Sequence, residues 1–322
     1  MTRREVIFAL AGGVAALWGK PLRAQQLRRI GLLRLAVFDQ IKDFHAGLAE
    51  CGYVEGRNLV IEDRFADRNY ARLPDMAADL VHRNVEVIVT AGGPGAVRAA
   101  MGATTRIPIV GSSVAPASAP FGIVKHHNRP EGNVTGVAIT TGDLMPKRLQ
   151  ILAEMAPGAL IGVLINPTSA THDRSRTMIE ETGQALQARL VFAAASTDAD
   201  LDAAFASFAG QHVGAIMAEA EPFLGSNWRR LISLAEHYKI PMMQEWREAV
   251  TAGGLISYAP SLQWVYRQVG RYAGQILNGT TVADLPVVAP DKIELTINLK
   301  AAKALGLTVP QSLLARADEV IE

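Results

Sequence analysis

Short apolar runs alternate with longer stretches of helical period through most of this chain. The runs are rich in Val, Ile and Leu and predict strands at residues 29–33, 58–62, 85–90, 108–110, 161–165, 190–193, 215–217 and 255–257. Between them apolar residues recur every three or four positions, as from Leu73 to Val81 and from Leu201 to Phe208, with Asp198 as the expected N-cap of the second helix. Such strand-helix-strand units build parallel sheets, so we expect an α/β fold.

The alternation pauses once, between residues 115 and 143, where prolines and glycines interrupt any long helix. We place the change from one half of the protein to the other here. A long amphipathic helix is predicted after Pro260, ending at the C-cap pair Asn278-Gly279. Two similar strand-helix halves predict a bilobed protein with a cleft.

The first 26 residues predict an export signal. Thr2-Arg3-Arg4 gives a charged start, an apolar run follows at 6–18, and Ala24 is a small residue at the expected cleavage point. An uncleaved membrane anchor is the alternative, but about 13 apolar residues are fewer than the roughly 20 that span a bilayer. We expect export to the periplasm by the twin-arginine or the general secretory route, since the paired arginines suit the former.

Charge argues against nucleic acid as a partner. Of 32 basic and 31 acidic residues, four basic and one acidic lie in residues 1–24, which leaves 28 against 30. A near-neutral chain lacks the clustered Lys and Arg that bind phosphate backbones. About 300 residues then remain, and this length favours two lobes.

The chain has one cysteine, Cys51, so no disulfide can form within it. A lone thiol invites a catalytic interpretation. However, Cys51 shares a predicted helix face with Ile41, Phe44 and Leu48, where cysteine behaves as a small hydrophobic residue. We expect it to be buried by packing.

Several segments resemble one family in order along the chain. They are Gly-Tyr-Val-Glu-Gly-Arg-Asn-Leu at 52–59, Arg-Leu-Pro at 72–74, Arg-Pro-Glu-Gly-Asn-Val-Thr-Gly at 129–136, Lys-Arg-Leu at 147–149, Ala-Gly-Gly-Leu-Ile-Ser-Tyr at 252–258, Asn-Leu-Lys-Ala-Ala-Lys-Ala-Leu-Gly-Leu at 298–307 and Arg-Ala-Asp-Glu-Val-Ile at 316–321. The chain is similar, over nearly all its length after the signal, to ABC-transporter substrate-binding proteins, the family that includes the tryptophan-binding TrpX-type lipoproteins.

The resemblance implies a type I periplasmic binding protein. Such a protein has two α/β lobes, each a parallel sheet flanked by helices, linked by three crossings, and its ligand binds in the cleft between the lobes. On this basis we expect an N-terminal lobe of residues 27–140 plus 261–284 and a C-terminal lobe of 141–260 plus 285–322. The expected partners are a small-molecule ligand and the transmembrane permease subunits, and we expect a monomer.

The sequence departs from the family where ligand identity is decided. Family members often carry Asp-Pro after the fourth strand, whereas Ala115-Pro116 stands here. The loop at 90–95 is unusually rich in glycine, and Gln-Glu-Trp-Arg-Glu at 244–248 replaces a stretch that commonly resembles Tyr-Gly-Phe-Arg-Glu. The identity of the ligand of this chain therefore cannot be inferred from the tryptophan-binding members of the family.

The glycine-rich loop is the first candidate for ligand contact. Gly92, Gly93 and Pro94 follow an apolar strand and precede a predicted helix, whose N-terminal amides can receive a carboxylate. Ser112 and Ser113, at the next strand end, can add hydroxyl donors. A tight turn without ligand is the alternative, and the loop lacks the glycine, lysine and serine spacing of nucleotide-binding loops.

Other candidates would bind the rest of an amino acid or organic acid. Asp39, Glu219 and Glu221 are possible acceptors for an ammonium, and Asn166 is a polar group expected to line the cleft. Solvated loop charges are the alternative for each carboxylate.

Aromatic residues stand at predicted strand ends. Phe38, Trp246 and Tyr258 can stack on an apolar or aromatic ligand, and Arg247 is the basic candidate if the ligand carries a second acid group.

A capture protein that performs no covalent chemistry is the leading hypothesis, with no cofactor or metal. The rival is an exported enzyme that uses Glu219, Glu221, Glu245 or His172 in the same cleft. A sugar-repressor-like regulator would need an N-terminal DNA-binding unit, and the export signal occupies that place. His126-His127 has no partner at a familiar metal-ligand spacing, so we expect a solvated loop.

Overall fold

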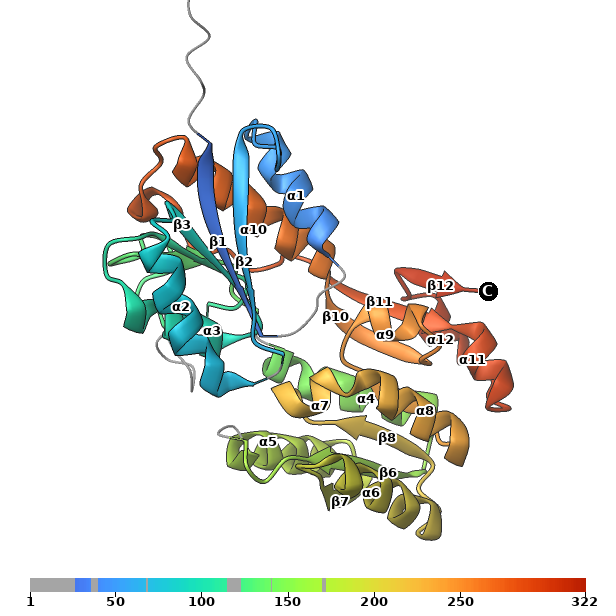
Figure 1. Cartoon of the computed structure of the whole chain (residues 1–322). Coiled ribbons are helices and arrows are strands. Elements are labelled where there is room, and N and C mark those ends of the chain that lie inside the picture. Colours follow the sequence, from blue (N-terminus) through green and yellow to red (C-terminus); the bar gives the residue numbers. More distant parts are fainter. Residues whose placement is uncertain (1–26, 36–39, 68, 115–122, 140, 170–171) are drawn as a thin grey trace, which may run out of the picture.

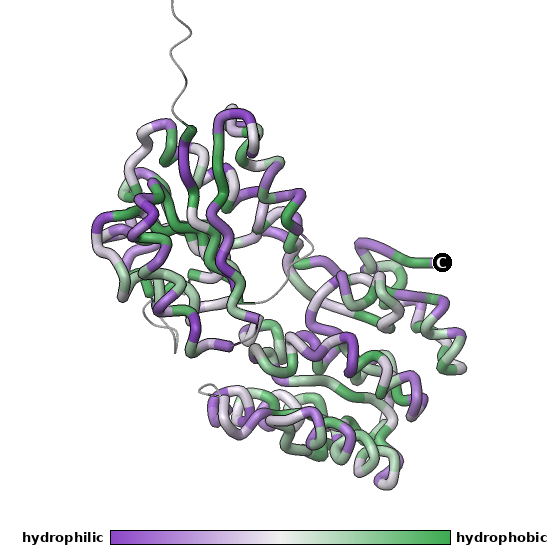
Figure 2. The backbone as a smooth tube through the Cα atoms, in the orientation of Figure 1, coloured by the Kyte–Doolittle hydropathy of each residue, from purple (hydrophilic) through white to green (hydrophobic). Residues whose placement is uncertain are grey.

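The protein consists of two α/β lobes, each built on its own sheet (Figure 1). A computed structural model of the chain describes residues 27–35, 40–67, 69–114, 123–139, 141–169 and 172–322. The expected α/β architecture, with mostly parallel strands flanked by helices, is confirmed. Figure 2 shows apolar residues along inner strands such as β8, whereas the outer helices alternate between apolar and polar residues.

The first lobe holds a five-stranded parallel sheet in the order β2-β1-β3-β4-β5. Its elements are β1 (Arg28–Arg34), α1 (Ile41–Glu50), β2 (Leu59–Phe65), η1 (Tyr70–Arg72), α2 (Leu73–His82), β3 (Val87–Ala91), α3 (Pro94–Ala103), β4 (Ile109–Gly111), β5 (Val134–Gly136), α10 (Leu262–Leu277) and η3 (Val282–Asp284).

Both faces of this first sheet are covered. Val87 and Val89 of β3 pack in the cluster under α1 and α10, whereas Ile88 packs in the cluster under α2 and α3. Because neighbouring strand residues point to opposite faces, a strand buried on both sides reads as a continuous apolar run, which is why β3 was predicted.

The long helix α10 returns to the first lobe and packs directly on α1. A Cβ on Gly270 would lie 2.1 Å from the carbonyl oxygen of Phe44, and one on Gly47 would lie 2.0 Å from that of Arg267. Only glycine allows two helix backbones to approach this closely. The predicted bounds of α10 are confirmed: Ser261 accepts a hydrogen bond from the Trp264 amide as N-cap, and the helix ends at Leu277, before Asn278.

The second lobe holds a seven-stranded sheet in the order β12-β11-β10-β9-β8-β6-β7, in which β11 runs antiparallel to β10. Its elements are η2 (Thr141–Leu144), α4 (Met145–Met155), β6 (Leu160–Ile165), α5 (His172–Ala185), β7 (Arg189–Ala194), α6 (Asp198–Gly210), β8 (Ala215–Ala218), α7 (Pro222–Ser226), α8 (Trp228–Tyr238), β9 (Met242–Gln244), α9 (Arg247–Thr251), β10 (Ile256–Pro260), β11 (Ile293–Asn298), α11 (Leu299–Ala304), α12 (Gln311–Leu314) and β12 (Glu319–Ile321).

Every strand predicted from the sequence is present, and four further strands, β5, β9, β11 and β12, were missed. Three of these are only three residues long, too short for a periodic signal. The expected N-cap Asp198 was also wrong. Thr197 caps α6 through its hydroxyl, and Asp200 completes the capping box.

The chain passes between the lobes after β5, after β10 and before β11. Before the last passage it stays beside β5: the Ala138 amide donates to Val288 O at 2.8 Å, and the Thr135 hydroxyl donates to Leu285 O at 2.7 Å. The segment 285–288 thus belongs with the first sheet, although we grouped it with the C-terminal lobe. In the described ranges, no helix combines the length and apolarity needed to cross a membrane.

Candidate ligand site between the two lobes

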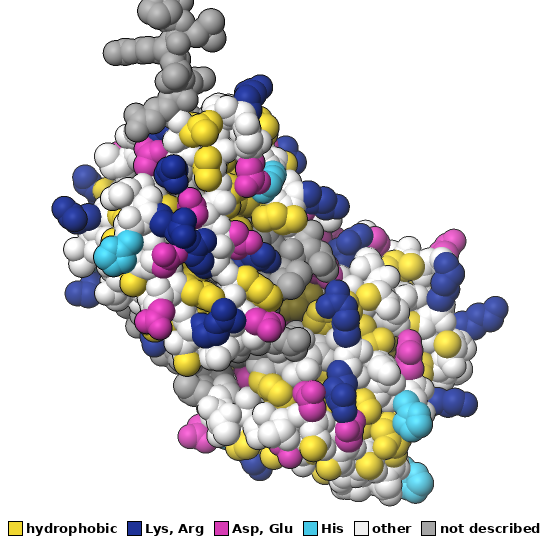
Figure 3. All heavy atoms as spheres, in the orientation of Figure 1, with side chains coloured by type: hydrophobic (Ala, Val, Ile, Leu, Met, Phe, Trp, Pro, Cys, Tyr) yellow, Lys and Arg dark blue, Asp and Glu magenta, His cyan; other side chains and the backbone are white. Residues whose placement is uncertain are grey.

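The segments that follow the parallel strands of one lobe contact the corresponding segments of the other. Figure 3 shows the surface hollowed between the two lobes. Gln40, which follows β1, donates through its Nε2 to Glu248 Oε1 of α9 at 2.6 Å. Ligands of open α/β sheets bind outside the carboxyl ends of the strands, so this region is the candidate site.

On the first lobe the glycine-rich loop leads directly into the start of α3. Gly92 has φ +117° and packs so closely on Leu35 that a Cβ would lie 2.4 Å from its Cβ. Gly93, with φ +83°, is the N-cap of α3 and provides no side-chain cap, and the helix begins at Pro94 as predicted. The first amides of α3 therefore lack a side-chain acceptor, and the helix dipole favours an anion there.

Ser112 lies at the end of β4 and is 4% exposed. Its hydroxyl is hydrogen-bonded to Tyr266 of α10, whose pKa is raised to about 12, chiefly by burial. Ser113 beside it is half-buried. Ser112 is thus held by the helix that returns to this lobe, a partner that the sequence did not indicate.

On the second lobe three predicted polar residues come together. Glu219, which is 1% exposed, accepts from the Asn166 amide at 3.1 Å, and the Asn166 side chain donates to Glu221 Oε2 at 3.0 Å. Glu221 also caps α7 by accepting from the amides of Phe223 and Leu224. The ends of β6 and β8 are adjacent because these strands pair, and this pairing places the three side chains together.

The Glu221 carboxyl has a raised pKa, chiefly because it is buried, with a smaller contribution from the charge of Glu219. Hydrogen bonds from Leu224, Asn166 and Phe223 act in the opposite direction by stabilising the carboxylate. Two desolvated carboxylates that accept hydrogen bonds from the same residue, Asn166, favour a cationic group beside them.

Tyr70 links the two sides of the site. Its ring packs against Gly95 in the first turn of α3, where a Cβ would lie 2.9 Å from Tyr70 Cε1. Burial, with the charge of Glu221 as the second cause, raises the pKa of Tyr70 to about 12. The Tyr70 side chain therefore packs on the first turn of α3 in one lobe and lies within electrostatic reach of Glu221 in the other.

A buried cation lies beneath the second lobe's part of the site. Arg148 is 2% exposed, and its guanidinium donates to Tyr258 O at 2.9 Å, Glu245 O at 3.0 Å and Thr141 O at 3.3 Å. Burial raises the pKa of the Glu245 carboxyl, whereas Arg148 and hydrogen bonds from Thr141 and Trp246 lower it. Glu245 lines a small cavity of about 20 Å³ together with Arg148 and Glu219.

Arg148 was not predicted as a site residue, although the sequence contained a signal for it. Met145, Leu149 and Leu152 are buried on α4, and Arg148 falls on the same face at helical spacing. An arginine on an apolar helix face needs internal acceptors. Tyr70 and Gln40 carried no comparable signal, because they stand in a short 3₁₀ turn and at a helix start.

Two other predicted ligand residues have partners within the second lobe. Arg247 forms a bidentate ion pair with Glu319 of β12, with N–O distances of 2.5 and 2.6 Å. Tyr258 packs against the apolar cluster under α4. Phe38 and Asp39 fall outside the described residues.

Other sequence candidates are structural. Cys51 lies at the C-terminal end of α1 against Gly274, where its thiol donates to Arg271 O at 3.4 Å and burial raises the thiol pKa. His126 and Glu131 form an exposed pair at 3.6 Å. Within the described ranges no group of three His, Cys, Asp or Glu residues is arranged to hold a metal ion.

Known relatives share this architecture. A tyrosine-binding protein of Clostridioides difficile (strain R20291) is 25% identical over 304 residues, covering 92% of this chain and 86% of the relative. The crystal structure of a conserved domain protein from Vibrio cholerae superposes with a TM-score of 0.80 at 26% identity, covering 92% of this chain and all of that one.

A Streptococcus pneumoniae ABC domain in complex with L-Trp has a TM-score of 0.76 at 21% identity, covering 91% of this chain and 100% of its own, and it shares the fold. The sequence model described as ABC transporter substrate binding protein matches residues 35–321, which include both lobes except β1, and all the site segments described above. The chain therefore belongs to the ABC transporter substrate-binding protein family.

Proposed function

We propose that this protein captures an amino acid with an apolar or aromatic side chain between its lobes and delivers it to the permease of an ABC importer. The observation that carries the proposal is the opposite polarity of the two sides of the site. The first lobe presents the backbone N–H groups at the start of α3, those of Gly93, Gly95 and Ala96, and the second presents the carboxylates of Glu219 and Glu221. This arrangement suits a zwitterion.

The ligand carboxylate would bind at the start of α3, where the dipole is favourable and no side chain caps the helix. The ammonium would bind beside Glu221. There it would donate charge-assisted hydrogen bonds to a carboxylate that burial has removed from solvent. Tyr70 is placed to contact both groups, and Trp246 offers an aromatic face on the second lobe.

The names of two similar proteins support this ligand class. One relative is described as a tyrosine-binding protein, and one structure of the same fold holds L-Trp. We propose tyrosine and tryptophan as the first ligands to test. The binding protein would act outside the cytoplasm, in the periplasm, after export directed by residues 1–26.

Calorimetric titration with L-tryptophan and two truncated analogues tests the zwitterion requirement. Tryptamine lacks the carboxylate and indole-3-propionate lacks the ammonium, so we expect each to bind at least 100-fold more weakly than tryptophan. A wider amino-acid panel covers the case in which another apolar side chain is preferred. Truncated analogues that bind as well as every amino acid would contradict the proposal.

The same experiment separates capture from catalysis. The rival function, an exported enzyme acting on a small carboxylate, would convert the bound molecule. Ligand recovered unchanged after prolonged incubation, as judged by mass spectrometry, supports capture. Accumulation of a product in proportion to protein concentration supports the enzyme instead.

A further inference from the structure

Arg148 holds the second-lobe ends of two of the three passages between the lobes. Thr141 begins η2 after the first passage, and Tyr258 lies in β10 just before the second. The guanidinium donates to Thr141 O at 3.3 Å and to Tyr258 O at 2.9 Å, and its remaining nitrogen donates to Glu245 O at 3.0 Å. Because the guanidinium is planar and rigid, these bonds fix the spacing of the three segments that they reach.

The third passage is bound to the other two. On the first-lobe side the Ala138 amide donates to Val288 O at 2.8 Å, and on the second-lobe side Ile293 of β11 pairs with Pro260 of β10. The three passages therefore form one connected unit. A side chain that fixes two of them at the second lobe restricts where the third can bend.

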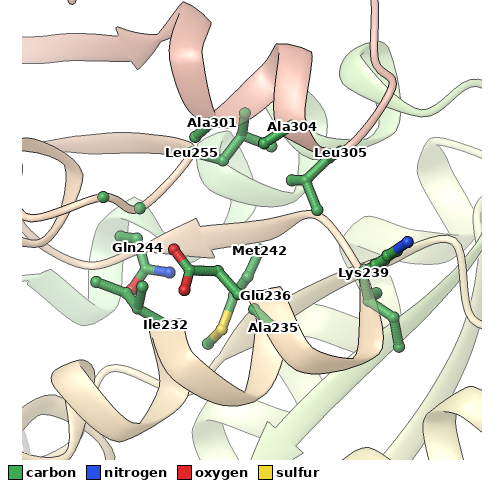
Figure 4. Close-up of a pocket in the computed structure, with 13 residues that line it drawn as sticks. Ile232, Ala235, Glu236, Lys239, Met242, Gln244, Leu255, Ala301, Ala304 and Leu305 are labelled. Carbon is green, nitrogen blue, oxygen red and sulfur yellow. The ribbon is translucent and has the colours of Figure 1, made fainter.

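Glu245 holds the first passage from another direction. Its carboxyl accepts a hydrogen bond from Thr141, and the positive charge of Arg148 stabilises its ionised form. Gln244, one position earlier, turns the opposite way, as neighbouring residues of a strand do. Figure 4 shows its carboxamide on the side of α8, pointing toward Glu236. Thr141 is thus bound twice, through its carbonyl by Arg148 and through its side chain by Glu245.

The carboxyl of Glu245 also packs against the short helix that carries part of the ligand site. A Cβ on Gly225 of α7 would lie 2.9 Å from Glu245 Oε2, so the carboxyl rests directly on the helix backbone. Glu221 caps the start of the same helix by accepting from the amides of Phe223 and Leu224. A movement of Glu221 on ligand binding would therefore reach Glu245 through α7.

We infer that Arg148 and Glu245 are positioning residues that join the ligand site to the passages between the lobes. They fasten Thr141 and Tyr258 to the second lobe, so bending occurs on the first-lobe side of these residues. They also transmit a displacement of Glu221 to the passages. This second part rests on the proposed function, because it takes Glu221 as a ligand contact, whereas the position of the bend is a property of the ligand-free protein.

Distances between spin labels measure the bending. Asp75→Cys on α2 and Gln184→Cys on α5 are exposed positions in different lobes, whereas Gln184→Cys and Lys300→Cys on α11 both lie in the second lobe. Cys51→Ala removes the native thiol from each labelled protein. Pulsed electron paramagnetic resonance then gives the distribution of distances between the lobes and, from the second pair, within one lobe.

Arg148→Lys keeps the positive charge but cannot bind three carbonyl groups with one planar fork. We expect the distribution between the lobes to become at least twice as broad in the ligand-free protein, while the distribution within the second lobe stays unchanged. Arg176→Lys, at an exposed arginine that pairs with Glu180 in α5, is the matched control. Equal broadening of both distributions would show general loosening of the second lobe, and this result, or no broadening at all, would overturn the inference.

Gly225→Ala tests the same link without removing any polar group, which keeps the inference testable if Arg148→Lys folds poorly. The added Cβ displaces the Glu245 carboxyl, and alanine suits a helix, so the fold should remain intact. We expect a broader distribution between the lobes and an affinity for L-tryptophan reduced several-fold. Gly210→Ala, whose Cβ would meet nothing at the end of α6, should change neither.

The ligand measurement separates this inference from the proposed function. Failure of the unmodified protein to bind any amino acid would contradict the proposed function, while the distances in the ligand-free variants would still decide where the protein bends. Undiminished L-tryptophan affinity in Gly225→Ala, together with unchanged distances, would refute the inference and leave the proposed function intact.

Discussion

Tyr70 and Glu221 belong to different lobes, yet burial and, second to it, the charge of Glu221 raise the pKa of the Tyr70 hydroxyl to about 12. The hydroxyl therefore stays protonated at every physiological pH and can donate a hydrogen bond. Because the Tyr70 ring also packs on the first turn of α3 at Gly95, this residue couples the proposed carboxylate site to the proposed ammonium site.

Replacing Tyr70 by Phe should weaken amino-acid binding about fivefold to tenfold, the usual effect of losing one hydrogen bond of about 1–1.5 kcal/mol. The ring remains, so its packing against Gly95 and the stability of the protein should change little. Tyr238→Phe in α8, outside the site, is the control and should bind like the unmodified protein. Calorimetry measures both variants. Equal affinity for Tyr70→Phe and Tyr238→Phe would exclude the hydroxyl from ligand contact.

Replacing Glu221 by Gln should reduce affinity for the zwitterionic ligand at least tenfold, because the ammonium loses a desolvated carboxylate. The amide oxygen of Gln can still accept from the Phe223 and Leu224 amides, so α7 should keep its cap. The folded-state pKa of Glu221 is raised above its ordinary value of 4.5. The carboxylate is therefore lost at a pH above 4.5 as the solution is acidified.

This shift gives the Glu221 variant a distinct pH dependence. The affinity ratio of the unmodified protein to Glu221→Gln should shrink as the pH is lowered toward 4.5, because protonation makes the two side chains alike. The protonated form is favoured in the folded protein, so acidification through this pKa should not itself destabilise the fold. A ratio that stays constant over the titration would show that Glu221 does not face the ligand ammonium.

The sequence was sufficient for the architecture because long apolar strands and amphipathic helices carry periodic signals. It also indicated Asn166, Glu219 and Glu221, since parallel strands that pair bring their carboxyl ends together. It did not indicate that Arg247 would pair with Glu319, because β12 is a three-residue strand with no pattern of its own. Contacts between lobes, such as that of Gln40 with Glu248, depend on how two separately folded sheets meet.

The backbone contact between α1 and α10 should make Gly270→Ala strongly destabilising. The added Cβ would lie 2.1 Å from Phe44 O, so the helices must separate, and overpacking of this kind costs about 1–3 kcal/mol or more. Gly102→Ala is the matched control within a helix: its Cβ meets nothing, so it should stabilise the protein by about 0.5–1 kcal/mol. Urea denaturation followed by circular dichroism compares the two. A Gly270→Ala protein as stable as the control would contradict the close helix contact.

Gln40→Ala removes the hydrogen bond that joins the first lobe to Glu248 of the second. If this bond stabilises the arrangement in which the lobes approach each other, its loss should favour the open form and weaken ligand binding a few fold. Small-angle scattering should then show a larger radius of gyration for the ligand-free variant, and saturating ligand should restore the smaller one. Gln211→Ala, at the end of α6, is the control. An unchanged radius and affinity would indicate that the lobes are held by other contacts.

Arg148 provides the strictest test of how the site is supported, because its guanidinium holds backbone from three segments, Thr141, Glu245 and Tyr258. Arg148→Met keeps the volume but leaves these carbonyl groups without a donor and the Glu245 carboxylate without its cation. Each buried carbonyl group that is left without its donor costs about 1–3 kcal/mol. Adding Glu245→Gln should recover part of the loss, since it removes a buried carboxyl that has lost the nearby positive charge, whereas Lys147→Met, at the exposed neighbouring position of α4, should cost little. Denaturation midpoints of the single and double variants measure this coupling, and simple additivity of the two losses would mean that Arg148 and Glu245 act independently.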